Sequence, residues 1–279
     1  MIKVIASDMD GTLFYGHGET VFDLTERNQQ ALQLVKHSGI RFHVASGRMI
    51  SYGKYILNQS HLTDQIIAGF NGAVIYDNGL IPVAHSLSIQ QVQKIISYVP
   101  SSFFKDGYLQ IQTFNNERLF DRPNHHEIET YAKEAGVPGI CKIFYDKTIY
   151  DYLHGSLDIT VGKLSIVSKY QEQAQPLFRI IKSAAEPDCF VTMSNPKCIE
   201  VMNPKANKGT FIQYLMDTYH YKKEEIAVIG DSLNDMDMYP FSTNRFAMAN
   251  GIDELKAQAD YIVQDVAECI ETCIKFNQQ

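Results

Sequence analysis

The chain has 279 residues, a formal net charge of −7 and 45% hydrophobic residues. This apolar fraction can bury a core, which excludes an intrinsically disordered chain, and the acidic balance with scattered basic residues argues against nucleic acid as a partner. No stretch is apolar for long enough to cross a bilayer, and acids break the opening MIKVIASDMDG too early for a signal peptide, so we expect no membrane partner.

The N-terminal part alternates apolar strands with helical segments. Strands are predicted over residues 2–6, 40–45 and 65–68. Residues 23–38 carry apolar positions at helical spacing, and Gly39 is placed to end that helix as a C-cap. Strands that alternate with helices predict a parallel sheet with helical crossovers.

The middle of the chain has a different order of predicted strands and helices. Its predicted strands cover residues 108–113, 159–167 and 190–193, and its predicted helices cover residues 89–98 and 126–135. Because strands and helices do not alternate strictly there, the pattern indicates an antiparallel sheet with helices on one face.

The C-terminal part returns to the first pattern. Its predicted helices cover residues 208–218, 234–238 and 252–259, and its predicted strands cover residues 226–229, 246–249 and 261–263. We therefore expect an α/β fold. Residues 1–81 and 201–279 would form a Rossmann-like parallel-sheet core, into which an α+β domain over residues 82–200 is inserted.

Five cysteines are present without a CxxC pair, which favours free thiols and a cytoplasmic location. Cys269 and Cys273 stand at helical i, i+4 spacing and could in principle contribute to a metal site. Two thiols do not complete a zinc site, so ordinary packing or surface positions are the favoured interpretation.

An acidic loop, Asp8-Met9-Asp10-Gly11-Thr12, directly follows the first predicted strand. Ligands of a parallel sheet bind at the carboxyl ends of its strands, and two carboxylates that converge there favour a hard cation such as Mg²⁺. An EF-hand loop would also begin D-x-D, with Glu19 at its twelfth position, but its sixth position requires glycine and is Leu13 here. A plain polar turn is the remaining alternative.

A second acidic segment, residues 230–235 with the sequence Gly-Asp-Ser-Leu-Asn-Asp, follows the predicted strand over residues 226–229. Asp231 and Asp235 are four residues apart, so one helical turn would place both carboxylates on one side. Asp231 or Ser232 as a simple N-cap would explain one acid and leave the other unexplained.

Two weaker motifs suit a phosphate. Ser46-Gly47-Arg48 follows the second predicted strand, where a hydroxyl and backbone amides can bind phosphate oxygens, although Ser-Gly is commonly just a turn. Lys208 begins a predicted helix, the end that the helix dipole makes unfavourable for a cation. A bound anion would account for that position, and a solvated surface lysine is the plain alternative.

Together these four motifs, in this order, resemble the haloacid dehalogenase (HAD) superfamily. The matches are DxDGT at residues 8–12, Ser46, Lys208 and GDSxND at residues 230–235. The insertion after residues 75–77, preceded by Phe-Asn-Gly-Ala at 70–73, resembles the Cof-type branch, whose members carry an α+β (type IIB) cap domain. The resemblance covers essentially the whole chain, with one departure at residues 248–251, which read Met-Ala-Asn-Gly where the family commonly has MGNA.

The resemblance implies a Mg²⁺-dependent phosphatase. Asp8 would be the nucleophile that forms an aspartyl-phosphate, and Asp10 would be the general acid for the leaving alcohol and then the base for water. Mg²⁺ would be held by Asp8, the Asp10 backbone carbonyl and Asp231.

The other predicted site residues bind phosphate or support the site. Lys208 and Ser46 would hold the phosphoryl oxygens. Further predicted phosphate-binding residues are Met9, Thr12, Gly47 and Asn234. Asp235, with Ser232 beside it, would orient Lys208 or a metal-bound water. Candidate substrate contacts are Arg48 and Asn71.

The inserted domain is expected to select the leaving group as a cap that excludes protein substrates. Its candidate polar residues are Arg118, Arg122, His125, His126, Lys142 and Lys163. The resemblance implies small phosphate esters such as sugar phosphates or pyridoxal phosphate. A phosphomutase with the same nucleophile is an alternative, and so is a non-catalytic binding protein, which the intact acids Asp8, Asp10 and Asp231 disfavour. The sequence indicates no oligomeric state.

Overall fold

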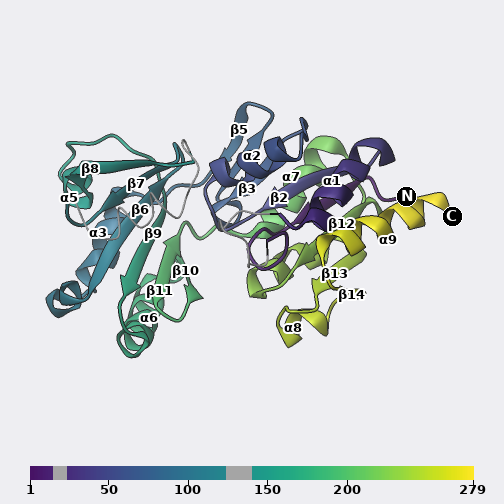
Figure 1. The fold of residues 1–279 in the computed structure, drawn as a ribbon. Coiled ribbons are helices and arrows are strands. Elements are labelled where there is room, and N and C mark those ends of the chain that lie inside the picture. The colour runs from purple at the N-terminus through teal and green to yellow at the C-terminus, as the bar shows by residue number, and fades with distance from the viewer. Residues whose placement is uncertain (15–23, 124–139) are drawn as a thin grey trace. The chain divides into compact units, whose positions relative to one another are not determined.

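The computed structural model describes residues 1–14, 24–123 and 140–279 (Figure 1). It separates into two compact units, which we describe one at a time. Unit 1 comprises Met1–Val83 and Asn207–Gln279, and unit 2 comprises Ala84–Ala206.

Unit 1 is built on an eight-stranded sheet in the order β14-β13-β12-β1-β2-β3-β4-β5. The strands are β1 (Val4–Ser7), β2 (Arg41–Ala45), β3 (Ile66–Gly69), β4 (Val74–Asp77), β5 (Leu80–Ala84), β12 (Ile226–Gly230), β13 (Asn244–Met248) and β14 (Tyr261–Val263). Pairing is parallel from β14 through to β3, whereas β4 runs antiparallel to β3. The predicted α/β fold with a parallel-sheet core is confirmed.

Helices connect these strands. They are α1 (Glu26–Ser38), α2 (Ile50–Gln59), α7 (Lys208–Tyr219), α8 (Asp253–Lys256) and α9 (Val266–Gln278), with 3₁₀ helices η1 (Phe70–Gly72), η3 (Lys223–Glu225) and η4 (Leu233–Phe241). Helix α1 ends at Gly39, which has the left-handed φ of 74° expected of a glycine C-cap. The predicted helix over residues 234–238 is instead part of the 3₁₀ helix η4, which ends shortly after Pro240.

Helix α7 packs on the sheet through apolar side chains. Phe211, Ile212 and Leu215 are fully buried in one cluster with Val4 of β1 and Val228 of β12. Burial of large apolar side chains contributes about 1.5–3 kcal/mol each, so this contact fixes α7 firmly against the sheet. The N-terminus of α7, where Lys208 lies, is therefore held relative to β1 and β12.

Unit 2 contains a six-stranded sheet in the order β10-β11-β9-β6-β7-β8. The strands are β6 (Gly107–Thr113), β7 (Glu117–Phe120), β8 (Lys142–Thr148), β9 (Val161–Ser168), β10 (Phe190–Asn195) and β11 (Cys198–Met202), and the helices are α3 (Ile89–Ser97), η2 (Ser101–Lys105), α5 (Ile149–Leu153) and α6 (Gln171–Ala185). The predicted antiparallel pairing holds except between β7 and β8, which are parallel. The predicted helix over residues 126–135 lies outside the described residues.

The two faces of the unit 2 sheet differ in polarity. One face carries Leu109, Ile111 and Ile166, which pack with α3 and α6 in a single apolar cluster. Helix α6 was not predicted, yet its buried positions recur at helical spacing: Ala174, Leu177, Ile181 and Ala185. The opposite face carries polar side chains that are nevertheless buried, namely Gln110, Gln112, Arg118, Lys163, Ser165 and Glu200.

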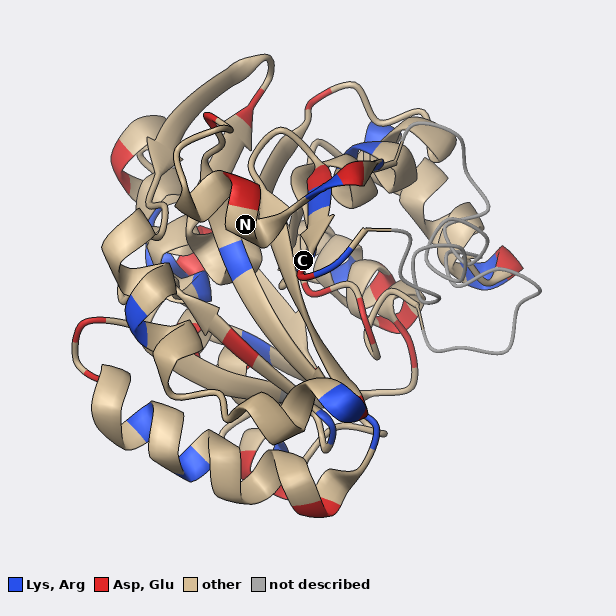
Figure 2. Ribbon diagram, turned by 90° about the vertical axis from the view of Figure 1, so that its left-hand side faces the viewer, with Lys and Arg blue, Asp and Glu red and all other residues tan. Residues whose placement is uncertain are grey.

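None of the described helices combines the length and apolarity required to span a membrane. All five cysteines are free, and Cys269 and Cys273 are fully buried in α9, in agreement with the packing interpretation. Figure 2 shows Lys and Arg distributed over many elements of the described chain. The cytoplasmic location stays a prediction.

His43 of β2 is a buried titratable group in the core of unit 1. Its side chain is fully buried, and neither ring nitrogen has a hydrogen-bond partner within the described residues. Burial lowers the pKa of His43 to about 4, with nearby Arg41 also lowering it and Asp64 and Asp77 opposing the shift. The imidazole is therefore neutral in the folded protein at neutral pH.

The free energy of unfolding should depend on pH through His43. The unfolded chain, with a His pKa of about 6.5, binds a proton that the folded chain excludes down to about pH 4, so stability falls as pH drops through this window by up to about 3 kcal/mol. We expect His43→Leu to reduce the stability difference between about pH 4.5 and about pH 7, measured by urea unfolding. An unchanged difference would contradict the buried neutral state.

Candidate active site

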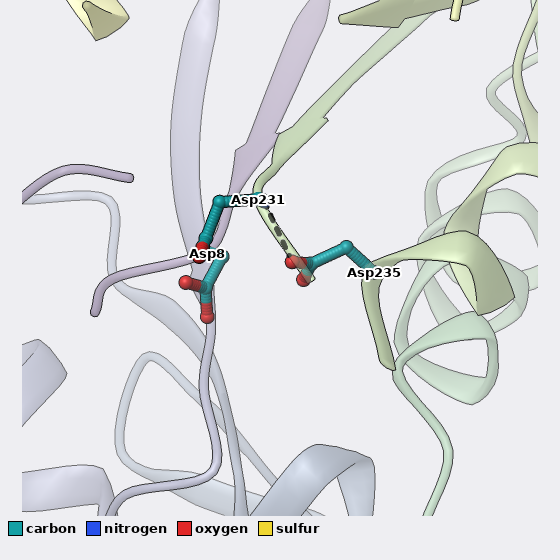
Figure 3. A group of neighbouring side chains, drawn as sticks. All are labelled: Asp8, Asp231 and Asp235. Carbon is teal, nitrogen blue, oxygen red and sulfur yellow. Dashed lines mark hydrogen bonds between the residues drawn. The ribbon is translucent and has the colours of Figure 1, made fainter. Parts of the chain in front are cut away.

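Two acidic loops meet at the carboxyl ends of neighbouring strands. Asp8 directly follows β1 and Asp231 directly follows β12, and these strands pair in parallel with Ser7 opposite Ile229. Oxygen atoms of Asp8, Asp231 and Asp235 all lie within 4.8 Å of one another (Figure 3). Asp8 follows a strand and not a helix, which excludes the EF-hand alternative.

Lys208 lies between two of these carboxylates. Its Nζ is 2.6 Å from Asp8 Oδ1 and 2.6 Å from Asp235 Oδ1, and its side chain is only 1% exposed. Burial disfavours the charged ammonium, but the two carboxylates outweigh it and raise the pKa of Lys208 above its usual range. Lys208, the first residue of α7, therefore stays protonated. Its ammonium group is stabilised by ion pairs with the two carboxylates and not by hydration.

The carboxyl group of Asp8 is in a strongly perturbed environment. Burial raises its pKa well above the usual range, the Lys208 ammonium opposes this shift, and neighbouring Asp235, Asp10 and Asp231 add to it. Burial likewise raises the pKa of Asp231, although Thr12 Oγ1 donates a hydrogen bond of 2.9 Å to its Oδ1. The repulsion between these carboxylates is what a bound cation would relieve.

Asp235 holds the second acidic loop in shape. Its Oδ2 accepts hydrogen bonds from the backbone N–H groups of Asp231 (2.9 Å) and Ser232 (3.0 Å), while its Oδ1 pairs with Lys208. A Cβ atom on Gly230 would lie 2.2 Å from Asp235 Cγ, so only glycine fits there. Ser232 is the N-cap of η4 and does not itself reach Lys208 in any contact that the structure shows. Asp235 therefore holds the Lys208 ammonium and the backbone of the second acidic loop together.

The carboxylate of Asp10 has a different partner. Arg48 Nε donates to Asp10 Oδ2 at 2.6 Å, and Arg48 Nη2 contacts Asp10 Oδ1. Asp10 does not belong to the group formed by Asp8, Asp231 and Asp235. The candidate substrate contact Arg48 therefore holds the Asp10 carboxylate apart from that group.

The predicted phosphate-binding residues differ in the contacts that their side chains make. Ser46 is buried, and its Oγ accepts a hydrogen bond of 3.1 Å from Arg48 N. Asn234 Nδ2 donates to Asn71 Oδ1 at 3.0 Å, which joins η4 to η1. The side chain of Met9 is fully buried, so Met9 can offer only its backbone to a ligand. Gly47, beside Ser46, would place a Cβ atom 3.2 Å from Asn71 Oδ1.

A third loop, between β13 and α8, ties the two acidic loops together. Asn250 Nδ2 donates to Gly11 O at 2.9 Å, and Ile252 N donates to Asp231 O at 2.9 Å. A Cβ atom on Gly251 would lie 2.9 Å from Asp231 O. Local sequence signals do not predict these contacts, because they join positions far apart in the chain.

The donors present fit a hard divalent cation. Asp8 and Asp231 offer carboxylate oxygens in the geometry described above, and such ligands suit Mg²⁺ better than a soft metal. Both oxygens of Asp235 are already engaged by Lys208 and by backbone N–H groups. Asp8 and Asp231 are therefore the side chains best placed to hold a metal.

Comparison with known proteins identifies the scaffold. The sequence profile of the haloacid dehalogenase-like hydrolase family matches residues 5–269, a span that contains all four motifs. The chain belongs to the haloacid dehalogenase-like hydrolase family. The predicted membership of this superfamily and the prediction of an enzyme are confirmed.

Individual HAD relatives cover nearly the whole chain. A Bacillus subtilis protein named 5-amino-6-(5-phospho-D-ribitylamino)uracil phosphatase YwtE is 28% identical over 290 residues, covering 94% of this chain and 93% of its own. A haloacid dehalogenase-like hydrolase from Bacteroides thetaiotaomicron superposes with a TM-score of 0.81 at 22% identity, over 98% of this chain and 100% of its own. A HAD subclass IIB sugar phosphatase superposes with a TM-score of 0.76 at 17% identity, over 97% and 98%. These matches agree with the predicted type IIB branch.

The candidate specificity residues of this HAD protein lie in unit 2. Arg118 and Lys163 are buried on the polar face of its sheet, where Arg118 Nη1 donates to Gln110 Oε1 at 2.7 Å and Lys163 Nζ pairs with Glu200 Oε1 at 2.6 Å. Arg122 donates to the backbone of Gly107 and Phe104. Lys142 is 68% exposed. His125 and His126 lie outside the described residues.

Gly72 places η1 against the start of α7. It has a φ of 88°, and a Cβ atom there would lie 2.2 Å from Asn207 O. Asn207 is the N-cap of α7, and its side chain accepts a hydrogen bond of 2.6 Å from Gly209 N. The absence of a side chain at Gly72 therefore lets Asn207, and with it Lys208, reach its place.

We expect Gly72→Ala to lose hydrolytic activity with a generic aryl phosphate by about tenfold or more, because displacement of Asn207 moves Lys208 by a few tenths of an ångström or more. Gly79→Ala is the matched control, since Gly79 also has positive φ (106°) but nothing lies within 4 Å of its Cβ position. It should cost about 1–2 kcal/mol of stability and leave turnover intact. Equal activity of the two variants would contradict the packing role of Gly72.

Proposed function

We propose that this HAD hydrolase is a Mg²⁺-dependent phosphatase that hydrolyses small phosphate esters through an aspartyl-phosphate on Asp8. The observation that carries the proposal is the position of Asp8, a buried carboxylate 2.6 Å from the Lys208 ammonium and within 4.8 Å of a second acid, Asp231. A nucleophilic carboxylate that must approach a phosphate dianion needs such positive charge beside it.

The reaction uses residues of unit 1 in two steps. In the first, an oxygen of Asp8 forms a bond to phosphorus and the bond between phosphorus and the leaving oxygen breaks. Asp10 donates a proton to the leaving oxygen. In the second, Asp10 takes a proton from water, which attacks phosphorus and releases inorganic phosphate while the Asp8 carboxylate is restored. Lys208 stabilises charge on the phosphoryl oxygens throughout, and the Ser46 hydroxyl would donate a hydrogen bond to them.

Asp8, the backbone carbonyl of Asp10 and Asp231 would hold Mg²⁺ in this scheme. The cation would neutralise charge between the nucleophile and the phosphate, which is the main chemistry it supplies when bound. Thr12 orients Asp231 by its hydrogen bond, and Asp235 keeps Lys208 in position. The Asp8 carboxylate thus lies beside both the Lys208 ammonium and the proposed Mg²⁺ site.

The proposed leaving group is a polyhydroxylated small molecule. One relative is named for a phosphorylated ribityl compound and one structural neighbour for sugar phosphates. Unit 2 carries alternating donors and acceptors on the polar face of its sheet, including Gln110, Lys163 and Glu200. Hydrogen-bonding side chains of this kind suit hydroxyl groups, so we propose that unit 2 selects the leaving group as the predicted cap.

Removal of the nucleophile should abolish turnover. We expect Asp8→Asn to lower phosphate release from a panel of sugar and polyol phosphates by at least about 10³-fold, because an amide cannot form the aspartyl-phosphate. Asp217→Asn, an exposed position on α7, is the matched control and should retain activity. Substantial phosphate release by Asp8→Asn would refute the proposed intermediate. An isomerised ester with little free phosphate would instead identify a phosphomutase.

Metal dependence gives a second test. Excess chelator should reduce turnover to background and added Mg²⁺ should restore it, because Asp8 and Asp231 repel each other and the substrate without a cation. Mg²⁺ should also raise the thermal unfolding midpoint of the wild-type protein, since it binds the folded state, and this rise should be lost in Asp231→Asn. Turnover that continues unchanged in chelator would contradict the metal assignment.

A further inference from the structure

Arg48 and Asp10 form a pair that joins two active-site loops. Asp10 follows β1 and Arg48 follows β2, 38 positions later in the chain. Each of the two carboxylate oxygens of Asp10 contacts a different guanidinium nitrogen, Nε at 2.6 Å and Nη2. A bidentate contact of this kind fixes the rotation of a carboxylate as well as its position, which a single hydrogen bond does not.

Both partners of the pair are themselves anchored. Arg48 N donates to Ser46 Oγ at 3.1 Å, Arg48 O accepts from Phe70 N at 2.9 Å, and the guanidinium lies over the ring of Tyr52, 5.1 Å from its centroid. On the other loop, Gly11 N donates to Phe14 O at 2.7 Å in the tight turn that follows Asp10. The guanidinium is therefore a fixed point against which the Asp10 carboxylate is oriented.

The Asp10 side chain needs such support. It is 46% exposed, in contrast to the buried Asp8, so packing alone does not restrict its rotamer. We propose that Arg48 is a positioning residue that orients the Asp10 carboxylate for proton transfer. This inference rests on the proposed function. The role acts through Asp10 and is distinct from the substrate contact of Arg48, which stays a prediction.

The pairing leaves Asp10 able to react. A carboxylate has about four lone-pair sites, and Arg48 takes one on each oxygen, so one site on each oxygen is still open for a proton. Because the guanidinium holds the plane of the carboxylate, the open sites keep a constant direction in both steps of the reaction. A general acid or base must lie within about 2.6–3.2 Å of the atom it serves, so loss of this orientation should cost rate.

The test compares two classes of ester. Phosphoryl transfer from an alkyl phosphate needs a proton on the departing oxygen, whereas transfer from p-nitrophenyl phosphate, with its acidic leaving group, needs it far less. We expect Arg48→Gln to lower kcat/KM for an alkyl phosphate by about 10²-fold and for p-nitrophenyl phosphate by less than about tenfold. This ratio reports the step in which the ester bond breaks, so it is insensitive to later hydrolysis of the intermediate.

Asp10→Asn gives the reference for lost proton transfer. It should show the same preference for the aryl ester, and the double variant Arg48→Gln/Asp10→Asn should be no slower with the alkyl ester than Asp10→Asn alone, because both changes act on one step. Arg48→Lys keeps the charge without the bidentate fork and should recover only part of the loss. It also provides a second variant if Arg48→Gln folds poorly.

Arg245 offers a matched control within unit 1. Arg245 lies on β13, away from the acidic loops. Its guanidinium forms an equivalent bidentate pair with the Asp260 carboxylate, at 2.9 Å from Nε and 2.7 Å from Nη2. Arg245→Gln should leave kcat/KM for both esters unchanged. Equal losses with both esters in Arg48→Gln, or additive losses in the double variant, would overturn the positioning role. Activity of Asp8→Asn would instead refute the proposed function itself.

Discussion

The interaction on which the site depends is the buried contact of the Lys208 ammonium with the carboxylates of Asp8 and Asp235. A cation that is 1% exposed is tolerated only because two anions lie 2.6 Å from it. The same contact stabilises the negative charge of Asp8 against burial and other acids. It also joins the loop after β1 to η4 and α7. The same contact therefore balances the charges of the site and holds these elements together.

The remaining loops of unit 1 are arranged around that contact by close packing at glycine and by hydrogen bonds to backbone groups. Gly72 lets η1 meet Asn207 at the start of α7, and Asn250 links the loop after β13 to Gly11. Asp235 folds the loop that carries Asp231 by accepting its backbone N–H. These contacts explain why the family motifs occur together, since each motif supplies either a charge or the backbone that positions one.

Much of this arrangement could be predicted because the signals are local. Apolar runs that end in acidic or small polar residues predicted that Asp8 and Asp231 each follow a strand of the parallel sheet, and the structure shows that these strands, β1 and β12, are neighbours. Two helical segments were not predicted correctly. Helix α6 was missed although its apolar spacing is regular, and the segment over η4 was predicted as a helix with an i, i+4 turn but forms a 3₁₀ helix.

By itself, the sequence determined the parallel-sheet core and the chemical types at the ends of its strands, because strand burial and turn chemistry depend on residues close together in the chain. Only the tertiary structure decided which charges pair. Lys208 and Asp8 are separated by 200 positions and Arg48 and Asp10 by 38, and nothing in local propensity links them. Strand order and helix packing bring these groups within hydrogen-bond distance, which made Asp235 the support of Lys208 and Arg48 the partner of Asp10.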